Sequence, residues 1–296
     1  MIPVASMSPR NDKGIGILKD FRGDELNQLF EVTFLGTNGS CAYNNGKRRK
    51  YGTNTICVAV KAGEETLVFD TGTGFCGLDG LPGYGQDTMH LFYSHFHADH
   101  IEGLLFSQLM FQAGQNINIY GHFNEALDLR RTLDNFLSPP LYPVGLNEFK
   151  ANLRFHTFAV GDVISLPNDV TVQTHALSHP GGSVGYRVEY GGKVFCYCSD
   201  VELSNHQNDA ELLKLTKNAD LLAMDAFFDD GRVIEGWGHS SWRQCAEFAR
   251  SADAKRLALF HYNYNLTDSE IEKMEDAAKK LFPETFAAAD FMQISL

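Results

Sequence analysis

The sequence predicts a mixed α/β (α+β) fold in which two β-sheets pack face to face and helices cover their outer faces. Three observations lead to this prediction. Short apolar runs with strand-like alternation cluster in both halves of the chain, and helical periods flank these clusters. Hydrophobic residues make up 44% of the 296 residues and include 22 phenylalanines, which is enough for a substantial core. Sheets of this kind bury one face against each other and the other under helices.

We interpret residues 1–30 as an N-terminal extension, because their polarity is mixed and without a clear period, and residues 31–296 as one domain. The extension is expected to pack on the domain or at the interface of a homodimer. Apolar alternation bounded by turn-forming residues predicts strands in the first half at 31–35, 55–60, 66–69, 89–93 and 117–120. A helical period predicts helices from 101 onward and at 124–137.

The second half reads as strand after strand and then as alternating helices and strands. Strands are expected at 153–158, 162–166, 170–177, 185–190, 193–198, 220–224 and 256–260, and helices at 209–217, 241–252 and 268–281. The last two helices open with capping boxes, Ser241-x-x-Gln244 and Thr267-x-x-Glu270, which satisfy the free backbone N–H groups of a helix start.

Composition narrows the class of protein. The formal net charge is −12, and this field repels long polyanions, which argues against long nucleic acid as a partner. The six cysteines are scattered, several within apolar runs, and are interpreted as buried thiols of a reducing compartment. No segment has the length of a transmembrane helix, and the N-terminus lacks the apolar core of a signal peptide. We therefore expect a soluble cytoplasmic protein without a membrane partner.

The stretch from Ser94 to Ile101, Ser-His-Phe-His-Ala-Asp-His-Ile, joins a predicted strand to a predicted helix. Alternate residues of an extended run point the same way, so His95 and His97 can reach one metal ion together. The chain then curls into the helix and turns Asp99 and His100 towards a second ion. Imidazole and carboxylate ligands suit zinc, and paired ions about 3.5–4 Å apart are a known hydrolytic device. Three histidines and one aspartate in six positions argue against chance.

Further donors follow predicted strands in both halves. His179, Asp200 and His261 each stand where an apolar strand ends, and Asp200 could bridge two ions with its two oxygens. His175, four residues before His179, is interpreted as a packed core residue. Asp70 follows the strand at 66–69, and it could accept the free ring N–H of a ligating histidine. Taken singly, each residue also fits a structural role, but their common position at strand ends favours a site.

Two further features are candidates for substrate chemistry. His239 lies in a glycine-containing loop before a helix, where it could donate a proton to a leaving oxygen or be merely a turn residue. The dense basic run Lys47, Arg48, Arg49 and Lys50 is a substrate-anion contact or a solvated surface loop.

These residues carry a resemblance to a known family. The run His95-x-His97-x-Asp99-His100 resembles the signature of the metallo-β-lactamase superfamily. Further motifs over residues 31–268 are similar to the phosphodiesterase-like branch related to ribonuclease Z and to the PhnP phosphodiesterase; they are Phe34-Leu35-Gly36-Thr37-x-Gly39-Ser40, Tyr51-Gly52-x-Asn54-Thr55-x-Cys57, Phe69-Asp70-Thr71-Gly72-Thr73-Gly74, His179-Pro180-Gly181-Gly182, Ser199-Asp200-x-Glu202 and Gly236-Trp237-Gly238-His239. The resemblance implies the four-layer αββα sandwich of the metallo-β-lactamase fold.

The resemblance also implies roles for the candidate residues. His95, His97 and His179 would hold one ion, Asp99, His100 and His261 the other, Asp200 would bridge them, and His239 would assist the leaving group. The tRNA-processing relatives carry a substrate arm between the third-histidine and bridging-aspartate motifs, and residues 180–199 are too few for one. This departure favours a small anionic substrate.

The expected function is a dinuclear-metal phosphodiesterase for a small phosphodiester or cyclic nucleotide. Asp99 would orient or deprotonate the attacking water, and His239 would protonate the leaving oxygen. Zinc is the favoured metal, and manganese or iron also suits a His/Asp site. The alternatives are a lactone or thioester hydrolase on the same centre, a ribonuclease Z-like nuclease, and a nucleotide-binding protein that keeps the metals without turnover.

Overall fold

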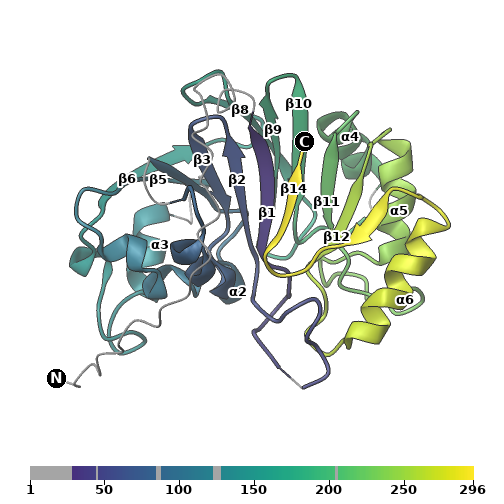
Figure 1. The fold of residues 1–296 in the computed structure, drawn as a ribbon, viewed down its shortest axis with the longest axis horizontal. Coiled ribbons are helices and arrows are strands. Elements are labelled where there is room, and N and C mark those ends of the chain that lie inside the picture. Colours follow the sequence, from purple (N-terminus) through teal and green to yellow (C-terminus); the bar gives the residue numbers. More distant parts are fainter. Residues whose placement is uncertain (1–28, 45, 85–87, 123–127, 204–205) are drawn as a thin grey trace, which may run out of the picture.

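The computed structural model describes residues 29–44, 46–84, 88–122, 128–203 and 206–296 (Figure 1). Seven strands form a first sheet in the order β14-β1-β2-β3-β4-β5-β6. These strands are β1 (Phe30–Gly36), β2 (Cys57–Ala62), β3 (Glu65–Phe69), β4 (Met89–Phe92), β5 (Asn116–His122), β6 (Asn152–Phe158) and β14 (Met292–Ser295). The β3–β6 strands run parallel to one another, whereas β14, β1, β2 and β3 pair antiparallel.

A second sheet of seven strands has the order β13-β12-β11-β10-β9-β8-β7. Its strands are β7 (Val163–Ser165), β8 (Thr171–Leu177), β9 (Ser183–Tyr190), β10 (Lys193–Cys198), β11 (Leu221–Asp225), β12 (Leu257–Phe260) and β13 (Thr285–Ala287). The β10–β13 strands are parallel, and β7 to β10 form an antiparallel meander. Parallel neighbours bring the ends of several strands to one edge of the sheet.

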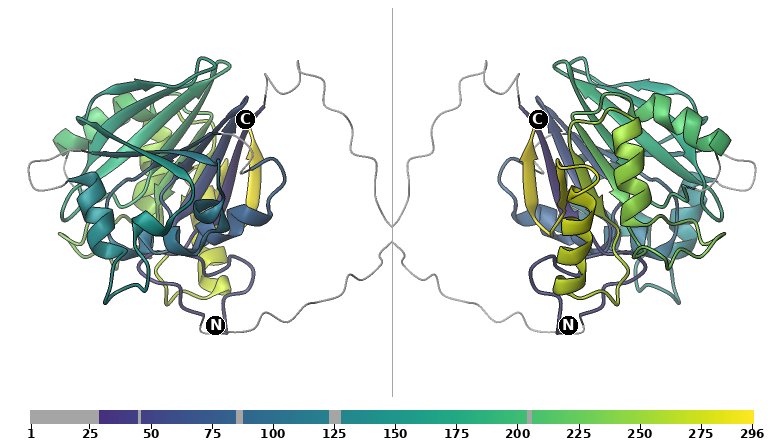
Figure 2. Two further views of the ribbon diagram at one scale, coloured as in Figure 1. Left: turned by 90° about the vertical axis from the view of Figure 1, so that its left-hand side faces the viewer. Right: turned by 90° about the vertical axis from the view of Figure 1, so that its right-hand side faces the viewer.

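Helices cover the outer faces of the two sheets (Figures 1 and 2). The first sheet carries α2 (Ala98–Ile101), α3 (Leu129–Phe136) and the 3-10 turns η1 (Thr73–Gly80), η2 (Leu104–Phe106), η3 (Gln108–Phe111) and η4 (Leu146–Glu148). The second sheet carries α4 (His206–Thr216), α5 (Trp242–Ser251) and α6 (Asp268–Lys279), with both predicted capping boxes formed at α5 and α6. Within the described part of the chain, no helix is long and apolar enough to cross a membrane.

Three apolar clusters explain the layering. The central cluster lies between the sheets and includes Phe34, Phe69, Tyr186, Tyr197 and Phe260. The other two lie under the helices, one beneath the first sheet's turns and α3, the other beneath α4, α5 and α6. The central strands β2, β3, β4, β11 and β12 are therefore covered on both faces and buried along their whole length, whereas the edge strands β6, β7 and β14 are partly exposed. The predicted four-layer αββα sandwich is confirmed.

Several element predictions differ from the structure. The helix expected from 101 onward is absent: α2 ends at Ile101, because the N–H of Gly103 donates to the oxygen of Thr71 in the loop after β3 at 2.8 Å and not to a carbonyl of the helix. The predicted helix at 124–137 begins, as described, at Leu129, and 123–127 lie outside the described residues. The strands β13 and β14 were not expected. They are short, and β14 exists by pairing with β1 at the other end of the chain.

The structure tests the prediction for the cysteines but not the one for the N-terminal extension. Residues 1–28 lie outside the described residues, and Phe30 already belongs to β1. The six cysteines are all free; four are buried as expected, whereas Cys41 and Cys76 are exposed.

Candidate metal centre

The centre is built where strands of both sheets end. His95 and His97 lie in the extended segment between β4 and α2, and Asp99 and His100 lie in the single turn of α2. A hydrogen bond from the backbone N–H of His100 to the oxygen of His97 curls the chain at this point. The strand-to-helix transition expected from the sequence therefore presents four donors within six positions.

The second sheet contributes the residues that follow β8, β10 and β12. His179 comes two residues after β8, Asp200 two residues after β10, and His261 directly after β12. Asp200 and His261 have positive φ angles of 54° and 55°, and Asp70, which follows β3, has 59°. This left-handed backbone is costly for residues other than glycine and is typically kept where function requires it. It turns each side chain back towards the edge shared by the sheets.

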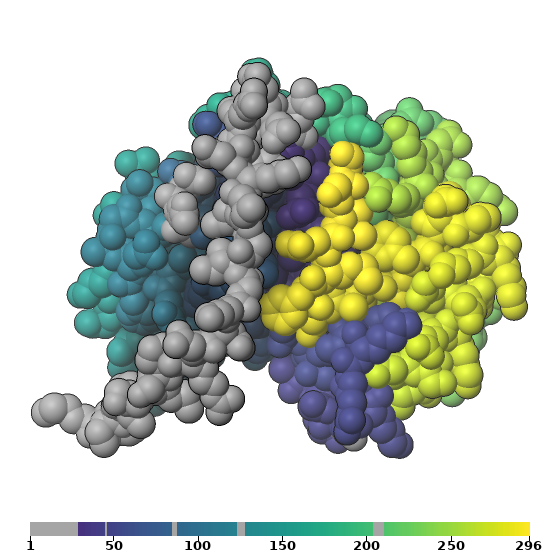
Figure 3. Space-filling model, in the orientation of Figure 1, coloured from purple at the N-terminus to yellow at the C-terminus, as the bar shows by residue number. Residues whose placement is uncertain are grey.

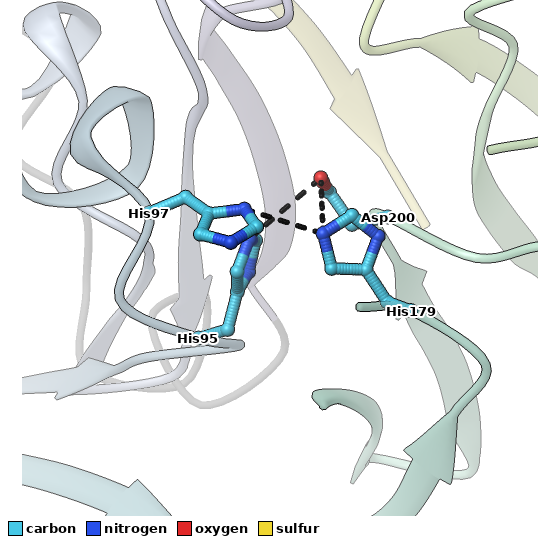
Figure 4. A group of neighbouring side chains, drawn as sticks. All are labelled: His95, His97, His179 and Asp200. Atoms are coloured by element: carbon cyan, nitrogen blue, oxygen red, sulfur yellow. Dashed lines mark hydrogen bonds and ion pairs between the residues drawn. The ribbon is translucent and has the colours of Figure 1, made fainter. Parts of the chain in front are cut away.

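A first group of donors consists of His95, His97, His179 and Asp200, whose candidate ligand atoms all lie within 4.8 Å of one another (Figure 4). Nδ1 of His97 lies 3.2 Å from Nε2 of His179. Oδ2 of Asp200 lies 3.6 Å from Nε2 of His179 and 3.8 Å from Nε2 of His95. Three imidazoles and one carboxylate oxygen thus surround one point, as a tetrahedral site requires.

A second group lies on the other side of Asp200. It consists of Asp99, His100 and His261, again with ligand atoms within 4.8 Å. The other oxygen of Asp200, Oδ1, lies 3.2 Å from Nε2 of His100 and 3.0 Å from Nε2 of His261. The carboxylate therefore faces the first group with Oδ2 and the second with Oδ1, which is the orientation of a bridging ligand.

The hydrogen bonding of these rings fits metal ions. Nε2 of His95, His100 and His261 is buried and, among the described residues, has no hydrogen-bond partner. Buried polar atoms of this kind are normally paired, and three at one point fit a partner that accepts nitrogen lone pairs, as a metal ion does. The donor set of histidine and aspartate is one that zinc and other divalent cations accept.

Electrostatics in the centre favour added positive charge. Burial alone would raise the pKa of Asp200, but His261 and His100 outweigh it and hold that pKa well below its usual value. Burial and the adjacent His100 lower the pKa of His95 well below its usual value, which leaves this ring neutral with a free lone pair. Burial lowers the pKa of His261, but Asp200 and Asp225 overcome this effect and raise it to about 10. A divalent cation at this position would likewise be stabilised by the negative charge of these carboxylates.

Hydrogen bonds on the far side of the rings fix their orientation. Nδ1 of His100 lies 2.8 Å from Oδ2 of Asp70, and Nδ1 of His179 lies 2.9 Å from the oxygen of Gly238. Donation from Nδ1 leaves Nε2 unprotonated and aimed into the centre. Asp70 is fully buried and also accepts from the backbone N–H of Ser94 and the hydroxyl of Tyr197, at 2.8 and 2.6 Å. The structure thus places Asp70 against a candidate ligand ring.

His239 lies beside the centre in the arrangement of a histidine–carboxylate pair. Its Nδ1 lies 2.7 Å from Oδ2 of Asp225, and Phe227 stacks on its ring with a centroid distance of 4.4 Å. His239, His261 and Asp200 offer ligand atoms within 4.8 Å of one another. Proton donation from Nδ1 to Asp225 directs Nε2 of His239 away from the carboxylate, so this nitrogen can exchange a proton elsewhere.

Sequence reasoning missed two acidic residues of this site. Asp225 is the last residue of β11, directly after the predicted strand 220–224, so the strand-end rule used for Asp200 could have found it. Glu202 is buried and accepts backbone N–H bonds from Gly236 and Gly238 at 2.8–3.0 Å. It therefore fixes the loop that carries His239. Its signal in the sequence was the motif Ser199-Asp200-x-Glu202, in which Glu202 was given no role of its own.

The basic run is not the uniform cationic surface that the sequence suggested. Arg48 is only 2% exposed, and its guanidinium donates to the side-chain oxygen of Asn38 and to the carbonyls of Leu266 and Asn263. A substrate contact through Arg48 is therefore a wrong expectation, because its donors are used inside the protein. The exposed Lys50 lies 3.0 Å from Glu272 of α6, beside which the loop protrudes (Figure 3). Lys47 and Arg49 are exposed.

The competing histidine, His175, lies on β8 and is half-buried. It is not packed in the core as expected. Partial burial lowers the pKa of His175, and the nearby carboxylate of Glu211 in α4 opposes this effect. No described metal-ligand group includes it. Of the two histidines, only His179 thus belongs to a candidate metal-ligand group, as the sequence predicted.

Comparisons with known proteins identify the family. A family model described as the beta-lactamase superfamily domain matches residues 65–262. Ribonuclease Z of Picrophilus torridus is 25% identical over 311 aligned positions, which cover 90% of this chain and 96% of that protein. The solved structure of the short form of human tRNase Z is 25% identical, with a TM-score of 0.65, and covers 90% of this chain and 98% of its own.

A new diphosphatase of the PhnP family shares the fold, with a TM-score of 0.66 at 17% identity and coverage of 90% of this chain and 98% of its own. These findings agree with the predicted ribonuclease Z/PhnP-like branch. The chain thus belongs to the beta-lactamase superfamily, and it is a metal-dependent hydrolase.

Proposed function

We propose that this protein is a phosphodiesterase that uses two divalent metal ions, zinc in the first instance, to hydrolyse a small phosphodiester. The observation that carries the proposal is the Asp225–His239 pair, with Nδ1 and Oδ2 2.7 Å apart, beside two groups of ligands joined by Asp200. A phosphodiester needs negative charge neutralised at its phosphoryl oxygens and a proton for its leaving oxygen. The two groups of metal ligands would supply the positive charge, and the Asp225–His239 pair would supply the proton.

The assignment of ligands follows the two groups. His95, His97 and His179 would hold one ion, Asp99, His100 and His261 the other, and Asp200 both. When bound, such ions neutralise phosphoryl charge and supply water of lowered pKa. Oδ2 of Asp99 accepts the backbone N–H of Ser40 at 2.7 Å, which fixes this carboxylate to orient or deprotonate the attacking water. His239 would donate its Nε2 proton to the departing alkoxide and become neutral, and Asp225 would stabilise the imidazolium that exists before this transfer.

A small substrate is supported by the connection between His179 and Asp200. The chain between them forms β9 and β10, with Lys193 paired to Tyr190 across a turn of Gly191 and Gly192. This hairpin contains no protruding arm. The net charge had argued against long nucleic acid as a partner. The similarity to relatives named ribonuclease Z weighs against that exclusion. RNA cleavage is therefore the second candidate function, favoured by similarity over 90% of the chain.

The test combines metal content with hydrolysis of bis(p-nitrophenyl) phosphate by the wild type, His239→Ala and the control His175→Ala. We expect two ions per chain in all three proteins. On a dinucleoside phosphate, whose alkoxide leaving group needs a proton, turnover should fall by about 10²–10⁴-fold only in His239→Ala, whereas p-nitrophenolate leaves without protonation and its release should change little. Full activity of His239→Ala on the dinucleoside phosphate would contradict the proposed proton donor, and a protein without bound transition metal would overturn the whole proposal.

Parallel assays separate the alternative substrates. A lactone and a thioester hydrolysed in preference to bis(p-nitrophenyl) phosphate would move the function to carboxylic esters on the same centre. Cleavage of a 3′-extended tRNA with higher kcat/KM than of a dinucleotide would support the nuclease. Metal binding without product from any of these substrates would leave a binding protein.

A further inference from the structure

A pocket of about 160 Å³ opens beside the candidate metal centre and has no role in the chemistry described above. Its lining includes His95 and His97 on one side and Phe96, His122, Pro180 and Gly182 around the rest. A group attached to a phosphoryl unit at the centre would enter this pocket first, because two of the candidate ligands form its wall. The pocket is therefore placed to select one substituent of the substrate.

The walls favour a flat apolar group. Phe96 is held in place by Tyr93, whose ring centroid lies 5.4 Å away, and by Gly121, where a Cβ would come within 3.3 Å of Phe96 Cζ. Gly181 and Gly182 have φ angles of +84° and +86°, and a Cβ on either would meet nothing within 4 Å. One wall is thus a fixed aromatic ring, and another is bare backbone in front of open space.

Size limits the group to about one ring. A cavity of roughly 150 Å³ accommodates a benzene molecule, so a single six-membered ring fills this open pocket, and a fused second ring would extend out of it. Stacking on an aromatic side chain stabilises any base or ring that presents a flat face. A purine is therefore expected to extend beyond the pocket, whereas a pyrimidine fits within it.

His122 adds one polar contact to this apolar lining. It is the last residue of β5, and its Nδ1 is buried without a hydrogen-bond partner among the described residues. A neutral imidazole has one donor and one acceptor nitrogen, and an orphaned buried donor is rarer than an orphaned acceptor. The proton is therefore expected on Nε2, which makes this nitrogen a donor for a ring carbonyl in the pocket.

We propose that this pocket binds the single-ring base of a pyrimidine nucleotide, with Phe96 as the stacking surface and His122 as the donor that selects a ring carbonyl. This inference rests on the proposed function, because the phosphate of the same ligand would lie at the metal centre. It deepens that proposal from a small phosphodiester to one that carries a pyrimidine nucleoside.

Binding to the metal-loaded full chain tests the pocket without requiring turnover. The probes are uridine 5′-monophosphate, adenosine 5′-monophosphate and ribose 5-phosphate, with Kd measured by isothermal titration calorimetry. We expect uridine 5′-monophosphate to bind at least about tenfold more tightly than ribose 5-phosphate, as base stacking implies. Adenosine 5′-monophosphate should bind less tightly than uridine 5′-monophosphate, because its fused second ring extends beyond the pocket.

Variants at position 122 assign the effect to the pocket. His122→Ala should remove most of the preference for uridine 5′-monophosphate and leave the Kd of ribose 5-phosphate unchanged, whereas His122→Gln, which keeps a donor, should retain part of it. The control is His156→Ala, since His156 lies on the neighbouring strand, stacks on Tyr120 and does not line the pocket. It should behave as the wild type.

The outcomes separate this inference from the proposed function. Equal affinity for uridine 5′-monophosphate and ribose 5-phosphate, or a preference that survives in His122→Ala, overturns the pyrimidine pocket even if bis(p-nitrophenyl) phosphate is hydrolysed. A preference that disappears in His122→Ala supports the pocket even if that diester is not hydrolysed, in which case the phosphodiesterase proposal fails alone. Tighter binding of adenosine 5′-monophosphate than of uridine 5′-monophosphate also overturns it.

Discussion

Asp225 contacts His239 through one oxygen and approaches His261 with the other. Oδ2 lies 2.7 Å from Nδ1 of His239, and Oδ1 lies 3.6 Å from Nδ1 of His261. One buried carboxylate thus connects the proposed proton donor with a proposed metal ligand. Burial opposes its charge, but His239 and His261 outweigh this effect and lower the pKa of Asp225, so it remains anionic.

Replacing Asp225 by Asn should impair the proton donor more than the metal centre. An amide keeps the shape of the side chain but cannot stabilise an imidazolium as a carboxylate does. We expect kcat to fall by about 10²–10⁴-fold while the metal content stays close to that of the wild type. The control is Asp230→Asn, which removes only a surface ion pair with Arg243. Wild-type kcat in Asp225→Asn would show that the pair has no part in the chemistry.

Asp200 is expected to govern the binding of both ions. Its two oxygens face the two groups of ligands, so Asp200→Ala removes a ligand from each, whereas Asp99→Ala removes one from the second group alone. We therefore expect Asp200→Ala to lose more metal than Asp99→Ala, measured by inductively coupled plasma mass spectrometry after dialysis. Two ions retained in Asp200→Ala would rule out a bridging role.

Asp70 should matter for folding as well as for the ligand ring. Asp70→Ala leaves buried donors of Ser94, Tyr197 and His100 without their acceptor. Each unsatisfied buried donor costs about 1–3 kcal/mol, so the free energy of unfolding should fall by about 3–5 kcal/mol. Urea denaturation of the metal-free protein measures this effect apart from metal binding. A loss below about 1 kcal/mol would mean that water replaces the carboxylate.

Arg48 and Lys50 should respond differently to replacement by Met. Arg48→Met removes buried hydrogen bonds to Asn38, Asn263 and Leu266, and the free energy of unfolding should fall by about 2–4 kcal/mol. The exposed ammonium of Lys50 pairs with Glu272 and lies over the ring of Tyr51, and because such surface contacts contribute little, its replacement should leave stability almost unchanged. Urea unfolding measures both. A KM for bis(p-nitrophenyl) phosphate that rises in Lys50→Met would instead support a substrate contact at this loop.

The raised pKa of Asp290 makes the free energy of unfolding depend on pH. Burial raises its pKa from 3.8 to about 6, against the opposing effect of N–H bonds from Asn54 and Thr37. The native state then binds this proton more tightly than the unfolded chain, so the free energy of unfolding should decrease as pH rises from about 4 to about 6. The loss is at most about 3 kcal/mol.

The variant Asp290→Asn tests this titration. An amide cannot ionise, so the variant should lack the part of the decrease that the wild type shows between about pH 4 and pH 6. Urea unfolding of both proteins across this window gives the comparison. Parallel curves for the two proteins would mean that Asp290 titrates at its ordinary value in the folded state.

Much of the fold was predictable because its signals are local. Apolar runs ending in turn residues located β8, β10 and β12 to within a few residues, and the capping boxes located α5 and α6. The candidate ligands were found by the same local rule, since each follows a strand. The strands β13 and β14 escaped prediction because they are short and depend on distant partners, as the pairing of Ser295 with Glu31 shows.

Residue type and spacing alone identify the residues that could serve the site: three histidines and an aspartate in one segment, with His179, Asp200 and His261 at later strand ends. How these residues face one another depends on the packing of the whole fold. That Asp200 presents one oxygen to each group depends on how two sheets pack, and that Arg48 is buried depends on the loop before α6. Local patterns encode backbone direction and exposure along a segment, whereas distances between segments arise from packing, which no single segment contains.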